Sequence, residues 1–120
     1  MVLRTLALFL VLGSSLHAQD LNMQLIDAAM RGDVAQIKSL LGSGAKPNTP
    51  DDDKRTPIAY AAAHGSLGAV QVLIDAGAAP DARDQEGGSP LMMAAAEGHT
   101  SIVALLVEKI SSALGTGEPR

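Results

Sequence analysis

The chain has 120 residues, a formal net charge of −4 and no cysteine, which excludes disulfides and lipid attachment at a cysteine. Acidic residues outnumber basic ones by 13 to 9, so no excess of positive charge is available for nucleic acid or for anionic membranes. Phe9 and Tyr60 are the only aromatic residues, which leaves almost nothing for stacking on nucleobases. We therefore expect neither a nucleic-acid partner nor a membrane-surface partner.

Residues 1–18 have the pattern of a secretory signal peptide. Arg4 precedes an unbroken apolar run from Leu6 to Leu12, and a short polar segment then ends at Ala18. The rival interpretation is an uncleaved anchor, but the run is well short of the roughly 20 residues that span a bilayer. We expect cleavage after Ala18 and export, to the periplasm rather than the medium. Loss of Arg4 would leave 8 basic and 13 acidic residues, a formal charge of −5.

The rest of the chain repeats with a period of 33 residues, marked by Gly32, Gly65 and Gly98. We divide residues 19–114 into repeats at about 19–50, 51–83 and 84–114, followed by a flexible tail at 115–120. Many apolar, small and turn residues recur in this register: Leu25, Ile58 and Leu91; Ala28-Ala29, Ala61-Ala62 and Ala94-Ala95; Ile37, Val70 and Val103; Leu40, Leu73 and Leu106; Gly44-Ala45 and Gly77-Ala78.

Each copy predicts two short helices and an extended turn, so the fold class is all-α. Thr56-Pro57 and Ser89-Pro90 combine an N-cap with a proline at the first helical position. The periodic glycines suit the left-handed conformation that ends the first helix. The second helix runs through residues 70–74, whose spacing buries one face, and closes at Gly77.

The second helix of the third copy departs from this pattern. Lys109-Ile110-Ser111 replaces the closing glycine and alanine, so we expect the helix to run on toward Leu114. Residues 102–107 are apolar at every position, although terminal repeats normally carry a polar outer face. Three coverings fit: Ile110, Ala113 and Leu114 folding back as a cap, self-association with a second copy through the last helix, or a partner protein.

The repeat resembles the ankyrin repeat, whose usual length is 33 residues and whose motif includes T-P-L-H-x-A. The matching strings are Thr56 to Ala61 (TPIAYA) and Ser89 to Ala94 (SPLMMA), with Gly98-His99 for the family's G-H. The motif histidine is replaced by Ala59 and Met92, and the first copy lacks Thr-Pro, as a capping repeat does. The resemblance implies an ankyrin-repeat solenoid of three helix-turn-helix repeats.

The resemblance also implies binding of another protein through a concave face and protruding turns. Carried over position by position, the implied contact residues are Arg31, Asp52, Asp53, Arg55, Ala63, His64, Gln85, Glu86, Gly88, Ala96 and Glu97.

No pattern of catalytic, cofactor-binding or metal-binding residues accompanies these positions. Asp51 to Asp53 are adjacent, whereas calcium loops space their carboxylates at alternate positions, so we interpret them as a solvated turn. His64 and His99 lack the companions of a zinc site. We expect His99 to pack beside the helix break and His64 to contact a partner or stay idle on the surface. The chain is therefore predicted not to be an enzyme and to need no cofactor.

Two functions fit a small exported binding module. Short exported bacterial ankyrin proteins assist periplasmic catalase, and this chain is similar to them in size and layout. The first expectation is thus a periplasmic adaptor or accessory protein that stabilises or regulates an exported protein such as a catalase. The alternative is a secreted effector that binds a host or competitor protein.

Overall fold

The computed structural model describes residues 20–114. The predicted signal peptide with its cleavage bond after Ala18, and the predicted tail at 115–120, lie outside the described residues. Within them the fold is all-α, without strands. Its elements are a first helix over residues 20–31, α2 (Val34–Gly42), α3 (Pro57–His64), α4 (Leu67–Asp75), α5 (Pro90–Ala96) and α6 (Thr100–Leu114).

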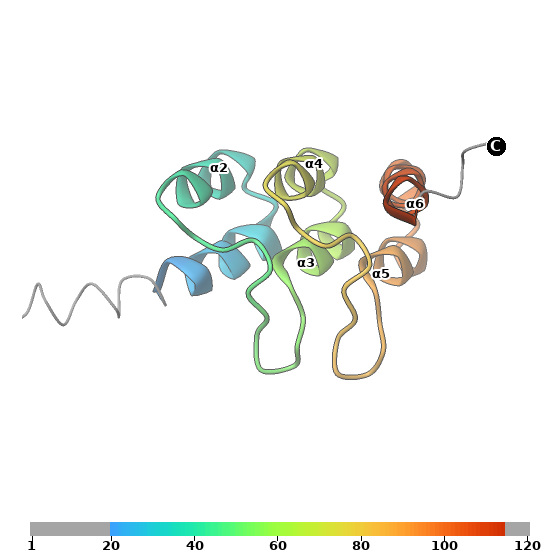
Figure 1. Cartoon of the computed structure of the whole chain (residues 1–120), viewed down its shortest axis with the longest axis horizontal. Helices are drawn as coiled ribbons and strands as arrows, with labels where there is room; N and C mark the ends of the chain where they lie inside the picture. The colour runs from blue at the N-terminus through green and yellow to red at the C-terminus, as the bar shows by residue number, and fades with distance from the viewer. Residues whose placement is uncertain (1–19, 115–120) are drawn as a thin grey trace, which may run out of the picture.

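The helices stack in two rows (Figure 1). The first helix of each repeat forms one row, from residues 20–31 through α3 to α5, and the second helices α2, α4 and α6 form the other. Two long loops project side by side on the side of the first row. We call residues 43–56 finger 1 and residues 76–89 finger 2.

Local residues set the helix ends as the sequence predicts. Ser89 Oγ accepts a hydrogen bond from the N–H of Met92 at 3.2 Å, which caps α5. Thr56 also stands at the N-cap of α3, but its Oγ1 is buried and bonds to no described residue. Gly65 and Gly98 end their helices with φ of 93° and 77°, in the left-handed region that glycine enters without strain.

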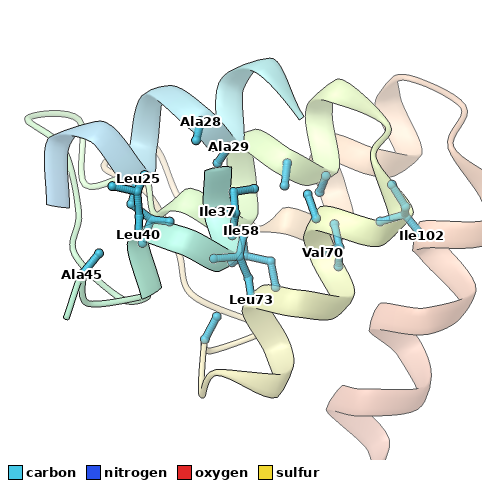
Figure 2. Packing of buried hydrophobic residues seen from close by; sticks show 14 of the residues in the cluster. Leu25, Ala28, Ala29, Ile37, Leu40, Ala45, Ile58, Val70, Leu73 and Ile102 are labelled. Atoms are coloured by element: carbon cyan, nitrogen blue, oxygen red, sulfur yellow. The ribbon is translucent and has the colours of Figure 1, made fainter. Parts of the chain in front are cut away.

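One apolar core runs along the stack, between and within the rows (Figure 2). Leu25, Ile37, Ile58 and Leu73 are completely buried, and so are the alanine pairs at 28–29 and 61–62. Small side chains let neighbouring first helices approach closely, and the helical period of 3.6 residues turns the leucines and valines of the second row toward them. The core is therefore shared between repeats.

The last helix confirms one prediction and excludes one of the three coverings considered for its apolar run. α6 does extend to Leu114, because Ile110 occupies the position of Gly44 and Gly77, whose φ values of 108° and 101° turn the chain. Without that glycine the helix continues, so residues 110–114 do not fold back as a cap. Ile110 is half-buried and Ala113 is exposed.

Replacement of Leu73 by alanine should destabilise the fold by about 2–5 kcal/mol, because it removes a fully buried side chain from the middle of the stack. Asp52→Ala, at an exposed position of finger 1, should stay within about 0.5 kcal/mol of wild type. Chemical denaturation of the two variants measures both values. Equal losses would contradict the repeat register.

Gly65→Ala and Gly98→Ala form a matched pair. Both place a side chain at positive φ, which costs about 1–2 kcal/mol. A Cβ on Gly65 would lie 2.6 Å from the His99 ring, whereas one on Gly98 would meet nothing within 4 Å. The Gly65 variant would also force His99 to leave its hydrogen bond to Ala63. In denaturant titrations we therefore expect its free energy of unfolding to be about 1 kcal/mol lower than that of the Gly98 variant. The reverse order would refute this packing role of His99.

Candidate functional site

The tight turn in each finger is shaped by the carboxylate that comes just before it. Asp51 Oδ1 accepts hydrogen bonds from the N–H groups of Asp53 and Arg55, both at 2.9 Å. One period later, Asp84 Oδ1 accepts from the N–H groups two and four residues on, at 2.9 and 2.7 Å. Because a charged acceptor satisfies two backbone donors in each turn, the two fingers have the same fixed shape.

A polar network ties finger 1 to finger 2. Arg55 Nε donates to Asp84 Oδ2 at 3.2 Å, and the Asp84 side chain is only 4% exposed. The Arg55 guanidinium also lies 5.8 Å from the centre of the Tyr60 ring, and Tyr60 Oη donates to Asp51 Oδ2. Gln85 N–H donates to the carbonyl of residue 53 at 2.8 Å, so backbone joins backbone as well. The fingers therefore hold a set spacing.

A second tie joins the bases of the fingers. Asn48 Nδ2 donates to the carbonyl of Gly77 at 3.0 Å, and Asn48 Oδ1 accepts from the N–H of Ala79 at 2.7 Å. Asn22, in the first helix, accepts from the N–H of Lys46 at 2.7 Å. Since Lys46 is one period before Ala79, Asn22 takes the place of the asparagine that an upstream repeat would supply.

The two organising carboxyl groups have pKa values below their ordinary value of 3.8. Burial raises the pKa of Asp51, but hydrogen bonds from Tyr60 and from the finger backbone, together with the charge of Arg55, outweigh it. The N–H of Gly88 is the main cause that lowers the pKa of Asp84, and Arg55 lowers it further. Both carboxylates are therefore charged at neutral pH.

A shallow cleft of about 200 Å³, the finger cleft, lies between the fingers. It is lined by Asp53, Arg55, Asp84, Gln85 and Glu86, of which all but Asp84 are predicted contact residues. The positive charge of Arg55 is matched by Asp84, while Asp53 and Glu86 are exposed and have no ion pair among the described residues. The cleft is therefore acidic.

A second group of predicted contact residues lies at the other end of the first helices. Arg31, His64 and Glu97 stand one period apart at the ends of the residue 20–31 helix, α3 and α5, and all three are exposed. Arg31 pairs with Asp27 at 2.8 Å, and the His64 ring lies against Gly32. The same row contains Ala63, half-buried, and Ala96, exposed. The predicted residues thus form two groups separated by the length of a short helix.

Several roles differ from the sequence-based interpretation. Asp52 and Asp53 are exposed, but Asp51 is half-buried and organises the turn, so "solvated turn" is wrong for Asp51. Arg55 pairs with Asp84 of the neighbouring finger, and Gly88 donates its backbone N–H to Asp84. The organisers Asp51, Tyr60 and Asp84 were missed, although the spacing of the two aspartates by one period was a signal that could have found them.

The remaining candidate sites give little chemistry. His99 Nε2 lies 3.1 Å from the carbonyl oxygen of Ala63, in keeping with the predicted packing role. Among residues 20–114, no group of three or more acidic, histidine or cysteine side chains is placed to hold a metal ion. No helix in that range is long and apolar enough to cross a membrane.

Comparison with known families bears on this architecture. A family model of ankyrin repeats, in three copies, matches residues 25–114. No curated protein matches the chain. The matched range contains both fingers and α2 to α6.

Acid should loosen the finger network. Lowered pKa values in the fold mean that Asp51 and Asp84 add stability above their ordinary pKa, and that this stability is lost as the pH falls through the lower folded values. At pH values below about 4, we expect the midpoint temperature of unfolding to decrease. The difference in midpoint temperature between wild type and Asp84→Asn should narrow over the same pH range. Calorimetry from neutral to acidic pH measures both, with exposed Asp52→Asn as the control. A gap that stays constant with pH would contradict this assignment.

Proposed function

The chain belongs to the ankyrin repeat family, and on this premise we propose that it is an exported adaptor of the bacterial type, which binds and stabilises or regulates a periplasmic protein. A catalase is the kind of enzyme that similar short exported proteins assist. Ankyrin repeats bind other proteins, so a protein-binding module rather than an enzyme is the function that the family supports.

The finger cleft is the observation that carries this proposal. Its walls are held by the Arg55–Asp84 pair and by the Gln85 backbone bond, so no loop has to be ordered when a partner arrives. The exposed carboxylates of Asp53 and Glu86 favour a partner segment that carries lysine or arginine. A pre-formed acidic cleft between fixed fingers suits recognition more than chemistry.

Affinity should be modest. Tyr60 is the only aromatic residue in the chain outside the predicted signal peptide, and it is half-buried within the finger network. Aromatic anchors supply most of the energy in tight interfaces. We therefore expect dissociation constants in the micromolar range or weaker, which corresponds to a binding free energy of about −8 kcal/mol at most.

Export and localisation are part of the proposal and have their own test. The support is the sequence pattern of residues 1–18. Fractionation of cells that express the full chain should recover the processed protein from the periplasm. Recovery from the culture medium would contradict the adaptor role and favour the alternative, a secreted effector that binds a host or competitor protein.

Charge reversal in the finger cleft should weaken binding. A periplasmic partner is first captured by affinity pull-down with the mature chain. We expect Asp53→Lys and Glu86→Lys each to reduce affinity for this partner by about tenfold or more, and to make the affinity less dependent on salt. Glu108→Lys makes the same change of charge at an exposed site on α6, away from the fingers, and is the matched control. Titration of the purified partner against the three variants measures the effect. Equal weakening by Glu108→Lys would show that net charge, not the finger cleft, governs binding.

A further inference from the structure

The last repeat exposes positions that the earlier repeats bury. Ala29 and Ala62 are completely buried, whereas Ala95, one period on, is exposed. Ala59 is 2% exposed, whereas its counterpart Met92 is 53% exposed. In the earlier repeats these positions are covered by the helices of the next repeat, so α5 presents one half of a repeat-to-repeat interface.

α6 continues the same exposed surface. Val70 is completely buried, but Val103 in the same register is only half-buried, and Val107 is 47% exposed. A Cβ on Gly65 would meet the His99 ring, whereas one on Gly98 would meet nothing within 4 Å. We call this surface the end face: Leu91, Met92, Ala95, Gly98, Val103 and Val107.

The opposite end of the stack is built differently. His64 and Ser66 contact the preceding repeat at Gly32, and their counterparts in the first repeat are Arg31 and Asp33. These two form an ion pair at 3.7 Å. Head-to-tail stacking would bury this pair against the apolar end face, where removing its charges from water costs more than their attraction returns. The end face therefore has no match at the first repeat of another copy.

The chain's own ends do not match the end face either. Residues 115–120 (GTGEPR) contain no large apolar side chain. The helix of residues 20–31 lies at the opposite end of the row of first helices from α5 (Figure 1). A surface of this kind on a small domain marks a site of association.

We propose that the end face packs against the end face of a second copy, forming a two-fold symmetric dimer. Its alanine and glycine positions leave room for close approach, as the alanine pairs do inside the stack, while Met92 and Val107 supply apolar area. A two-fold contact uses one surface twice and closes after two chains. The proposal is independent of the finger cleft.

The charges around α5 suit this symmetry. Arg83 Nη1 lies 3.9 Å from Met92 Sδ, near the start of α5, and is exposed. Glu97 is exposed at the end of α5. If the two α5 helices run antiparallel across the axis, Arg83 of each copy faces Glu97 of the other. In this antiparallel arrangement, the charges at the edge of the end face on one copy match those on the other.

Analytical ultracentrifugation of the mature chain, residues 19–120, tests the proposal without any partner. We expect a monomer–dimer equilibrium from micromolar concentrations upward. Val107→Glu should raise the dissociation constant by about tenfold or more, because it would bury an unpaired charge. Ala104→Glu is the matched control on the same helix, since its counterparts Lys38 and Gln71 remain exposed within the stack. Circular dichroism should show that both variants fold, as both sites are exposed.

A charge swap tests the symmetry. Arg83→Glu and Glu97→Arg should each weaken the dimer, and the double variant should restore it, whereas Asp53→Lys in the finger cleft should have no effect. A chain that stays monomeric at all concentrations would overturn the proposal. It would do so even if another protein were found to bind the end face. Open-ended oligomers, or equal disruption by Ala104→Glu, would overturn it as well.

Discussion

The burial of apolar side chains between neighbouring repeats is the interaction on which the rest of this structure depends. One helix pair is too small to cover Ile58, Val70 or Leu73, which are completely buried only because repeats lie on both sides of them. The fully buried alanines at 28–29 and 61–62 set how closely the first helices approach. Since the chain has no cysteine, this burial must hold the fold without disulfides.

The same spacing determines the geometry of the proposed binding surface. Because the first helices repeat at a constant separation, the fingers that precede α3 and α5 lie side by side (Figure 1). Only then can Arg55 of one finger reach Asp84 of the next, and Gln85 N–H reach the carbonyl of residue 53. The contacts add rigidity to a spacing that the apolar core has already established. A core substitution that tilts one repeat would therefore distort the finger cleft from a distance.

The sequence predicts what depends on local chemistry and periodicity. The glycines at positive φ, the Ser89 cap before Pro90, and the extension of α6 past Ile110 follow from residues within a few positions of one another. The Arg55–Asp84 pair joins residues 29 apart through the stacking distance, which no local pattern contains. Fold-back of residues 110–114, one of the three coverings considered for the apolar run, does not occur for a related reason: no turn-forming glycine interrupts α6 before Leu114.

The two ends of the stack differ in the chemistry of their outer surfaces. At the first repeat, Asn22 supplies the acceptor that a preceding repeat would provide, and the Arg31–Asp33 pair makes the outer surface hydrophilic. At the third repeat, Asp81 occupies the position of Asn48, but the N–H one period beyond Ala79 is inside α6 and already bonded within the helix. The first end is thus adapted to water, while the second keeps the pattern of an internal repeat. This difference between the two ends favours the proposed dimer over an open-ended stack, because the Arg31–Asp33 pair at the first repeat does not match the apolar end face.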